Sequence, residues 1–372
     1  MSGVVPKEVA TLMGVIDTHC RYQSINGAPR NYRIYHPSAL GGCLRLMQYQ
    51  RLAEDPEIEG LQLASDPLES KTYRLFDTGH SMHDRWAKYW EEIGVLRGIW
   101  ECSNRVCRAF DDSGEFIGTD KVNEIRSKYK EVSEEAPDYL HNLTDNERKE
   151  EVKKRNALSP RRYGYEEKVG VFKPKKCACG CEEFKYHEIN VKDNDLNIYG
   201  HADLILDFSE FDVDRYSSQG EDNKGYKLVD RTFDPANLPK KPIVVDMKSI
   251  NDRGFRKLSQ DGPSLKYKVQ LITYCNILDL EYGVLIYENK NDSLTSSFRV
   301  NRSEEKDWPI IQRQIKLMNK MYDNKRLPPP RPLRKDSYDC KYCDYKDVCH
   351  NSKIWADPNL NEKRIKFYDT LI

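Results

Sequence analysis

The sequence has 372 residues, of which 38% are hydrophobic, 10% aromatic and 32% charged, and its formal net charge at pH 7 is zero. A chain of this length can bury a substantial core in one large domain or two ordinary ones, and its composition excludes a low-complexity protein. The balanced charge excludes a uniformly basic nucleic-acid-binding protein but leaves room for a basic groove offset by acidic loops and ligands.

No segment is typical of a targeting signal or a membrane span. The first residues lack a charged stretch followed by a long apolar core, and no apolar run is long enough for a bilayer. We therefore expect a soluble, cytoplasmic protein without a membrane partner. In a reducing compartment its 11 cysteines are expected to be thiols and metal ligands rather than disulfides.

The N-terminal half is predicted to be mainly helical. A helix over 39–52 is expected to follow Ser38, a candidate N-cap. A second helix is predicted over 73–94, with an apolar side formed by Met82, Trp86, Tyr89 and Trp90. Residues 119–168 carry dense mixed charge and are predicted to form a solvated helical excursion.

The C-terminal half adds strands. Residues 196–208 and 242–250 are β-branched and apolar enough for central strands, and the polar stretch 209–241 between them suits a long loop. A helix over 264–280, a strand–turn–strand over 283–300, a helix over 303–325 and a proline-rich linker over 326–332 follow. This order predicts an α/β (α+β) fold with a mixed central sheet flanked by helices.

Asp246 and Lys248 lie two residues apart in a predicted strand, so both side chains point to the same face. A carboxylate and an ammonium on an otherwise apolar strand are costly unless something uses them, and Asp203 is a second carboxylate of this kind. Mg²⁺ or Mn²⁺ would hold both carboxylates and activate a water, which Lys248 would orient. A strand-end ion pair, with Asp203 capping a turn, is the alternative.

Two predicted helices carry further candidates. His83 follows Gly79, which is expected to open a turn, and could supply a nitrogen ligand to Mn²⁺, with His80 on nearly the same face. Gln270 and Tyr274 are spaced i, i+4 and share a helix face that could contact a phosphate backbone or stack a base. A satisfied helical histidine and a half-buried tyrosine are the alternatives.

The order of these motifs is Gly-x-x-x-His, a strand aspartate, Asp-x-Lys and Gln-x-x-x-Tyr. It resembles the RecB-type branch of the PD-(D/E)XK nuclease superfamily over roughly residues 36–350. The resemblance implies a restriction-endonuclease-like core and a Mg²⁺- or Mn²⁺-dependent deoxyribonuclease, expected to be an exonuclease acting on DNA ends or single strands. It assigns metal binding to His83, Asp203, Asp246 and the Met247 backbone carbonyl, catalysis to Lys248, and DNA contact to Gln270 and Tyr274.

A cysteine motif near the C-terminus extends the resemblance. The stretch "CKYCDYKDVCH" contains Cys340, Cys343 and Cys349, and three thiolates so closely spaced indicate a metal site that lacks its fourth ligand. Iron–sulfur members of this branch, the AddB-type helicase–nucleases and CRISPR-associated adaptation exonucleases, have one cysteine upstream of the nuclease core and three downstream. The resemblance therefore implies a [4Fe–4S] cluster completed by Cys43; a Cys₄ zinc site would satisfy the same ligands.

A second cysteine group brackets the charged excursion. It consists of Cys102, Cys107, Cys177, Cys179 and Cys181. The segment "CACGC" resembles half of a zinc ribbon, in which a glycine after the thiolate lets backbone amides approach the sulfur. We expect Zn²⁺ to be held by Cys102, Cys107, Cys179 and either Cys177 or Cys181. Cys275, on an apolar helix face, is expected to be a core thiol.

These assignments divide the chain into four parts. Residues 1–100 form the N-terminal helical part, 101–185 the insertion with the zinc site, 186–325 the nuclease core and 326–372 the iron–sulfur tail. Basic residues before and within the helix at 264–280 would line the path of a DNA strand, or form an ordinary solvated loop: Arg253, Arg256, Lys257, Lys266 and Lys268. The sequence has no P-loop, so unwinding would belong to a helicase, recombination or replication partner. A catalytically silent DNA-binding or assembly subunit is the alternative function.

Overall fold

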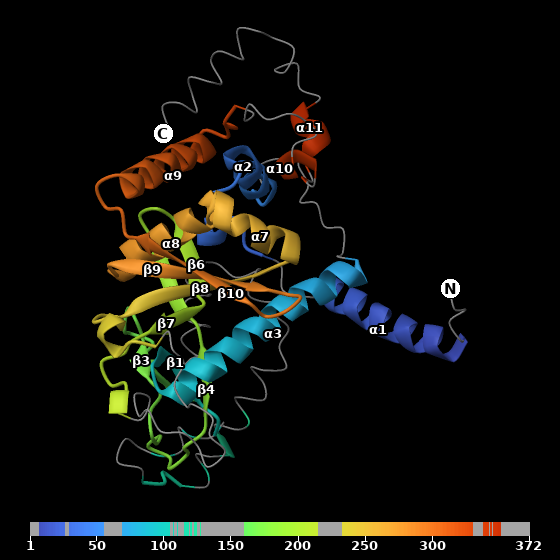
Figure 1. Cartoon of the computed structure of the whole chain (residues 1–372). Helices are drawn as coiled ribbons and strands as arrows, with labels where there is room; N and C mark the ends of the chain where they lie inside the picture. Colours follow the sequence, from blue (N-terminus) through green and yellow to red (C-terminus); the bar gives the residue numbers. More distant parts are fainter. Residues whose placement is uncertain are drawn as a thin grey trace. The chain divides into compact units, whose positions relative to one another are not determined.

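Helices and strands alternate along the chain in a mixed α/β structure whose strands pair both parallel and antiparallel, as the sequence predicts. The computed structural model describes residues 7–26, 30–55, 69–104, 160–214, 233–329 and most of 338–350, with scattered positions between 107 and 127 (Figure 1). The chain divides into two compact units. Unit 1 comprises residues 1–85, 190–201 and 244–372, and unit 2 comprises 86–189 and 202–243. Most of the predicted charged excursion, and parts of the long loop and the linker, lie outside the described residues.

Unit 1 contains the strand that carries the Asp-x-Lys motif. This strand, β8 (Ile243–Ile250), runs parallel to β9 (Tyr282–Asn289), and β9 pairs antiparallel with β10 (Thr295–Asn301). The first five positions of β8 are buried, as expected for an apolar interior strand. The register sets Asp246 beside Leu285 and Lys248 beside Tyr287. The motif is thereby fixed in the interior of the sheet.

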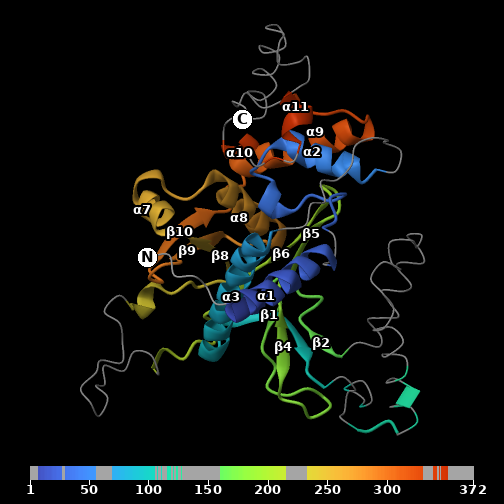
Figure 2. The same cartoon turned by 90° about the vertical axis from the view of Figure 1, so that its right-hand side faces the viewer.

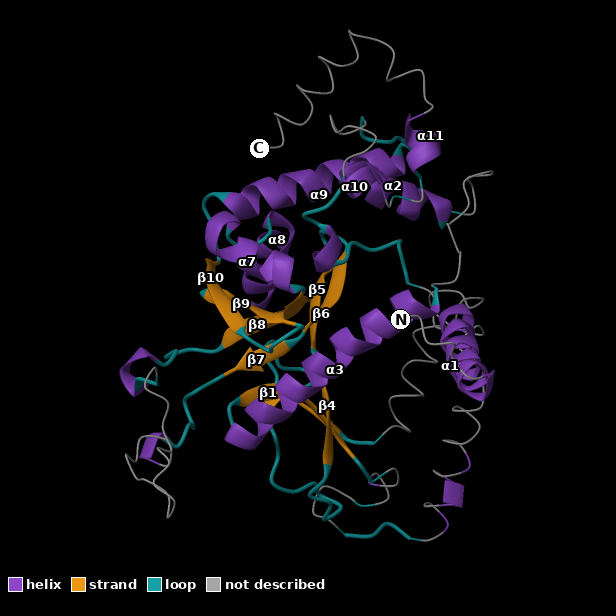
Figure 3. Ribbon diagram, turned by 45° about the vertical axis from the view of Figure 1, so that its right-hand side comes forward, coloured by secondary structure: helices purple, strands orange, loops and turns teal. Residues whose placement is uncertain are grey.

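A helical crossover joins the two parallel strands, as their direction requires. Two helices, α7 (Asp252–Asp261) and α8 (Leu265–Leu278), follow β8 and lie over the strands in Figure 3. α8 confirms the helix predicted over 264–280, whereas α7 is not among the predicted helices. Its boundaries are local: Asn251 caps it by accepting the Gly254 N–H at 2.8 Å, and Gly262 ends it at φ 66°.

Segments from both ends of the chain meet at α2 (Leu44–Ala53). The long helix α9 (Asp307–Asp323) packs beside α2, and the short helices α10 (Tyr338–Lys341) and α11 (Lys346–His350) lie close by (Figures 1 and 2). Arg51 of α2 donates a hydrogen bond to Asn319 of α9 at 2.6 Å. The two ends of unit 1 are therefore connected by polar contacts as well as by packing.

The predicted N-cap at Ser38 is wrong. Ser38 lies in a 3₁₀ turn, η1 (Pro37–Ala39), and helix α2 begins only after two glycines, with Cys43 at its N-cap. Proline starts the turn because its φ is already fixed, and glycines are poor residues for continuing a helix. Gly41 also lies against the backbone of Lys266, where an added Cβ would come within 2.4 Å of the Lys266 Cα.

Helix α3 (Ser70–Ile93) confirms the helix predicted over 73–94. The expectation that Gly79 opens a turn is wrong, because Gly79 lies in the helix interior. A Cβ added at Gly79 would meet no neighbour within 4 Å, so nothing in the described packing requires a glycine there. Of the predicted apolar side only Met82 is buried, and Tyr89 is exposed.

A further helix, α1 (Lys7–Asn26), contacts the first turns of α3. Arg74 forms an ion pair with Asp17, and the Ser70 hydroxyl donates to the Asp17 carbonyl at 2.9 Å. Across the described part of the chain, no helix is both long and apolar enough to cross a bilayer.

A small hairpin, β5 (Ile189–Asp193) and β6 (Ile198–Ala202), completes the description of unit 1. Its turn is stabilised by Asp193, whose carboxylate accepts the Leu196 N–H at 2.9 Å, and Asn197 adopts φ 56°. Asparagine tolerates this left-handed conformation better than most residues, so the sequence suits the turn.

Unit 2 is built around β1 (Leu96–Cys102) (Figure 2). Four strands pair antiparallel with it: β2 (Arg162–Tyr163), β3 (Val171–Phe172), β4 (Phe184–His187) and β7 (Leu204–Leu206). A 3₁₀ turn, η4 (Pro235–Asn237), also belongs to this unit. Trp100 is fully buried at the centre of β1 and donates its indole N–H to the Val171 carbonyl at 3.0 Å.

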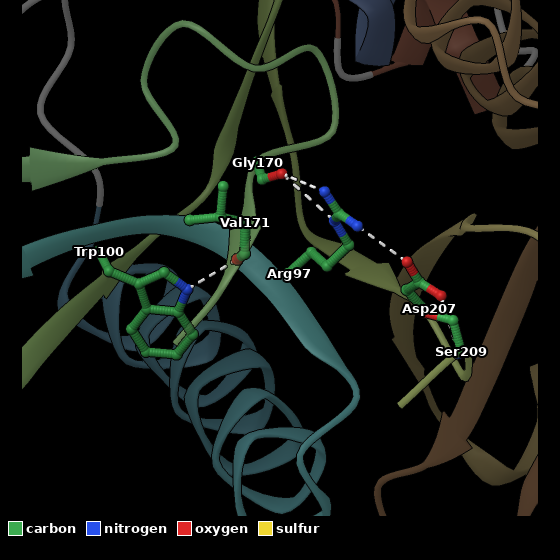
Figure 4. Close-up of polar contacts among 6 residues, drawn as sticks. All are labelled: Arg97, Trp100, Gly170, Val171, Asp207 and Ser209. Atoms are coloured by element: carbon green, nitrogen blue, oxygen red, sulfur yellow. Dashed lines mark hydrogen bonds and ion pairs between the residues drawn. The ribbon is translucent and has the colours of Figure 1, made fainter. Parts of the chain in front are cut away.

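A buried ion pair ties β1 to the end of β7 (Figure 4). Arg97 donates to the Asp207 carboxylate at 2.9 Å and to the Gly170 carbonyl at 2.7 Å, while the Ser209 N–H donates to Asp207 at 3.0 Å. Burial alone would raise the pKa of Asp207, but the hydrogen bonds from Ser209 and Arg97 outweigh it, so the pKa is lowered. The carboxylate therefore contributes stability above its unfolded pKa of about 4, and this contribution is lost as pH falls through the lower folded pKa.

Asp207→Asn should lower the free energy of unfolding at pH 7 by about 1–3 kcal/mol, because Arg97 loses its charged partner. Urea denaturation at pH 7 and at pH 3 measures the effect, which should shrink at the lower pH, because pH 3 lies below the ordinary pKa of the carboxyl group in the unfolded chain. Asp195→Asn, at an exposed position, is the matched control. An equal loss at both pH values would contradict the role given to the charge.

Candidate active site and metal centres

The Asp-x-Lys motif forms a buried ion pair on β8. Asp246 is 0% exposed, and the Lys248 ammonium lies 2.9 Å from its Oδ1 and 2.8 Å from its Oδ2. The Lys248 side chain retains 19% exposure, so it extends from the buried carboxylate toward solvent. Both side chains share one strand face, as the two-residue spacing predicts.

Helix α8 supplies a hydrogen-bonded support for Asp246. Gln270 donates through Nε2 to Asp246 Oδ1 at 3.0 Å and lies 2.9 Å from the Tyr274 hydroxyl. Tyr274 in turn donates to the His201 carbonyl at 2.7 Å. Both helix residues are 3% exposed. These bonds favour a role in positioning Asp246, and the DNA contact expected of Gln270 and Tyr274 stays a prediction.

His83 of α3 reaches the same strand. Its imidazole is hydrogen-bonded to the Met247 carbonyl, so two of the predicted ligand groups lie within bonding distance of each other. Burial lowers the pKa of His83, and the Lys248 ammonium lowers it further, against the opposing effects of Asp246 and Met247. A lowered pKa keeps the imidazole neutral at pH 7, which is the form that binds metals.

Three residues of this region escaped the sequence analysis. The Lys248 ammonium lies over the Tyr267 ring, 4.9 Å from its centroid. Arg85, which follows His83 by two residues, pairs with the buried Glu288 of β9 through contacts of 2.5 and 2.6 Å. Tyr267 precedes Gln270 by one helical turn, and that spacing was the signal that could have found it. The Arg85–Glu288 pair fixes α3 against β9 and with it the position of His83.

Asp203 belongs to unit 2, where it interrupts the strand predicted over 196–208. It occupies a bend between β6 and β7, and its carbonyl accepts the Tyr186 hydroxyl at 2.9 Å. Glu188, a carboxylate that the sequence analysis missed, has an oxygen within 4.8 Å of an Asp203 oxygen. Burial raises the pKa of Tyr186 well above its ordinary value, and these two carboxylates add to the effect. The pair could help hold a metal ion; that Asp203 shares one with Asp246 stays a prediction.

The predicted zinc ligands of unit 2 gather in one buried cluster. The sulfurs of Cys102, Cys177 and Cys179 lie within 4.8 Å of one another and could hold a metal ion, and the sulfurs of Cys102 and Cys179 are 3.7 Å apart. Cys107 is fully buried in the same cluster. Four thiols therefore converge from β1, from the segment after it and from residues 177–179.

Burial raises the pKa of the Cys102 and Cys107 thiols, whereas hydrogen bonds lower the pKa of Cys177. The Arg161 backbone N–H donates to Cys107 Sγ at 2.9 Å, and the Tyr163 hydroxyl donates to Cys177 Sγ at 3.3 Å. Burial opposes ionisation, but the bonds from Tyr163 and from neighbouring groups lower the pKa of Cys177 to about 7. A thiol with such a pKa is readily deprotonated by a bound metal.

Cys181 makes a different contact. Its thiol donates to the Glu183 carbonyl at 3.4 Å, whereas its own carbonyl accepts the Cys177 N–H at 2.8 Å. Gly180, at φ 84°, makes the tight turn between the two. The spacing left Cys177 and Cys181 open as the fourth ligand. The geometry favours Cys177, because the Cys181 thiol contacts the Glu183 carbonyl instead.

The cysteines predicted to hold the iron–sulfur cluster belong to unit 1. Cys43 is the N-cap of α2, Cys340 lies on α10 and Cys349 on α11. Burial raises the pKa of the Cys349 thiol, the nearby Arg45 guanidinium lowers it, and the Cys43 and Cys340 thiols raise it, so these three thiols are within electrostatic reach of one another. Cys343, the fourth predicted ligand, and Cys349 act in the same way on Tyr49. That these four cysteines together hold one metal centre stays a prediction.

Comparisons with known proteins add one weak likeness. No protein-family model matches the sequence, and no curated protein matches it. A solved structure described as "Crystal structure of SSO0001" aligns with 91% of this chain and 96% of that chain, at 11% identity and a TM-score of 0.35. A likeness of this extent carries no argument about function.

Proposed function

We propose that the chain is a Mg²⁺- or Mn²⁺-dependent deoxyribonuclease, with exonuclease action on DNA ends or single strands. The observation that carries the proposal is the fully buried Asp246 carboxylate, bonded to both Lys248 and Gln270 and bordered by the neutral imidazole of His83. A buried carboxylate and ammonium cost several kcal/mol to desolvate, so a strand with no use for them would be at least as stable with apolar residues. A catalytic role explains their presence.

The donor atoms at this site suit a hard divalent cation. Asp246 offers carboxylate oxygens and Met247 a carbonyl, while His83 adds a nitrogen that Mn²⁺ accepts. Gln270 Oε1 is buried without a hydrogen-bond partner, and such an oxygen would be satisfied by a cation or its water. When bound, the ion would polarise a phosphodiester and lower the pKa of a water ligand. In this proposal Asp203, with Glu188, would supply the remaining oxygen ligands.

Lys248 is the group that we assign to the attacking water. Its ammonium is anchored on Asp246 yet its side chain is 19% exposed, so it can orient a water or donate to a non-bridging phosphate oxygen as negative charge develops. Tyr267, against which the ammonium rests, limits the positions it can adopt. Gln270, which also contacts Tyr274, holds the Asp246 carboxylate in position through its hydrogen bond.

A DNA path over α7 and the start of α8 fits the charge distribution. Arg253, Arg256 and Lys257 of α7 and Lys266 of α8 are at least partly exposed, and they precede the buried Gln270 along the chain. Such residues attract phosphates without regard to sequence, so binding should weaken steeply as salt is raised. Unwinding, where needed, would come from a helicase or recombination partner.

We further propose that the two cysteine groups are structural metal centres. Cys43, Cys340, Cys343 and Cys349 would hold a [4Fe–4S] cluster that joins the two ends of unit 1, and Cys102, Cys107, Cys177 and Cys179 would hold Zn²⁺ in unit 2. Both ligand sets consist of thiols from segments distant in sequence. Each centre would therefore close long loops of the unfolded chain and stabilise the fold.

The proposed function is tested with end-labelled single-stranded and double-stranded DNA. We expect mononucleotides or short products to accumulate with Mn²⁺ or Mg²⁺ and to disappear when EDTA is added. Product lengths over time separate stepwise removal from internal cleavage. DNA binding without any metal-dependent loss of substrate would contradict the nuclease and favour a catalytically silent DNA-binding or assembly subunit.

A further inference from the structure

Arg45 is a buried cation at the N-terminal end of α2. Its side chain is one of few charged groups in the described core, with a relative exposure of 5%. It donates to the Pro328 carbonyl and, at 3.1 Å, to the Tyr49 hydroxyl, and its guanidinium lies 5.2 Å from the centre of the Tyr49 ring. These neutral contacts orient the guanidinium but do not balance its charge.

The charge of Arg45 faces the cysteine group of unit 1. Its guanidinium lowers the pKa of the Cys349 thiol, and Arg45 follows Cys43 by two residues on the first turn of α2. The buried Nε atom has no hydrogen-bond partner, and among the described residues no carboxylate forms an ion pair with Arg45. An arginine side chain keeps its charge in proteins, and a buried charge without compensation is costly. A negatively charged group beside it would offset that cost.

Arg45 lies in aromatic surroundings, and its low exposure leaves little room for water to solvate its charge. Tyr49 stacks on Tyr345, with ring centroids 5.0 Å apart and planes 3° from parallel. Tyr345 is itself 5% exposed, and its carbonyl accepts the Cys349 N–H at 2.8 Å. Arg45 therefore lies beside a stacked pair of buried aromatic rings. In such a low-dielectric position a positive charge acts strongly on its neighbours.

We propose that Arg45 is the charge partner of the metal centre held by Cys43, Cys340, Cys343 and Cys349, and that it sets the reduction potential of that centre. This inference rests on the proposed [4Fe–4S] cluster. Four thiolates give such a cluster a net negative charge, which one buried guanidinium compensates in part, and the Nε–H is available to a cluster or cysteine sulfur. Net charge and hydrogen bonds to sulfur are the properties by which a protein tunes these potentials.

The direction of the effect follows from the charge. Reduction adds one electron to a centre that is already negative, and a fixed positive charge stabilises the reduced form more than the oxidised form. Removing the charge should therefore make reduction harder. Lysine retains the charge but not the planar set of donors, so it should restore part of the effect.

The test uses the full-length chain, purified anaerobically, with wild type compared with Arg45→Met, Arg45→Lys and Tyr49→Phe. Iron per chain and visible absorption are measured first, and then the reduced fraction is followed in a mediated potential titration. At a fixed potential we expect the reduced-to-oxidised ratio of Arg45→Met to fall about tenfold, equivalent to about 59 mV for a one-electron couple. Arg45→Lys should fall in between. Tyr49→Phe, which loses the hydroxyl contact and keeps the ring and the charge, should match wild type.

Other outcomes are equally decisive. Equal potentials for wild type and Arg45→Met would overturn the inference. Should Arg45→Met fail to retain iron, retention by Arg45→Lys would support a charge role, and iron loss from Tyr49→Phe to the same degree would overturn it in favour of packing. Colourless, zinc-loaded wild-type protein would overturn both the cluster and this inference, whereas its DNA cleavage would still be measured separately and would leave the nuclease proposal standing.

Discussion

Asp246→Asn and Lys248→Met should each reduce metal-dependent DNA hydrolysis by about 10³-fold, the order of magnitude expected when one group that stabilises developing charge is lost. The asparagine substitution keeps the shape of the side chain and can still accept the Gln270 hydrogen bond, but it loses the anionic oxygens that a divalent cation requires. The methionine substitution fills the same space as lysine without its charge. The two variants thus remove different functions of one ion pair.

The measurement is the initial rate of label release, at saturating Mn²⁺, for wild type and both variants. Thermal unfolding of each variant shows whether the fold persists, because replacing a buried pair is often tolerated whereas a lost partner can be costly. Lys316→Met, at an exposed position of α9, is the matched control for a lost ammonium. Wild-type rates in both active-site variants, with the fold intact, would remove the mechanism.

The central strand and helix of this site were predictable from the sequence, because their signals are local. The run of β-branched and apolar residues around Asp246 specifies an interior strand, and the two-residue spacing to Lys248 specifies a shared face. The Gln270 and Tyr274 spacing likewise specifies one face of α8. The spacing did not show whether this helix face points to solvent or to the interior. In the structure it points inward, toward Asp246 and the His201 carbonyl.

Features that depend on tertiary contacts were not predictable in the same way. Glu288 lies far along the chain from Arg85, and no periodic pattern links them. The break in the predicted strand at Asp203 was not predicted, because it depends on a bend between β6 and β7. Helix α7 was missed although Asn251 and Gly262 are recognisable end signals, since its short charged sequence has only Phe255 and Leu258 as large apolar residues.

The cysteines illustrate the same division between local and tertiary information. Their spacing defined two groups but left Cys177 and Cys181 as equal candidates, because both flank the same turn. The contacts separate them: Cys177 Sγ lies with Cys102 and Cys179, and Cys181 donates to Glu183. Chain geometry at Gly180 decides which of the two sulfurs points into the cluster.

Three cysteine substitutions should therefore give a double dissociation of the two metals. Cys102→Ser should reduce zinc from about one equivalent per chain to near zero while leaving iron unchanged, because a structural zinc site needs all four ligands. Cys43→Ser should do the reverse, removing iron and the visible absorption of the cluster while zinc stays bound. Cys181→Ser should keep both metals, since its thiol is not assigned to either centre.

Loss of either metal should also lower the thermal stability of the protein. Binding of a structural metal contributes directly to folding, so Cys102→Ser and Cys43→Ser should each lower the thermal midpoint by roughly 5–10 °C, as expected for a loss of a few kcal/mol in a domain of this size. Elemental analysis of anaerobically purified protein, combined with thermal unfolding, measures both effects. Zinc loss from Cys181→Ser would reverse the assignment of the fourth ligand to Cys177. Simultaneous loss of iron and zinc from either single variant, in protein that is still folded, would mean that the two centres are not the independent supports inferred from their separate ligand sets.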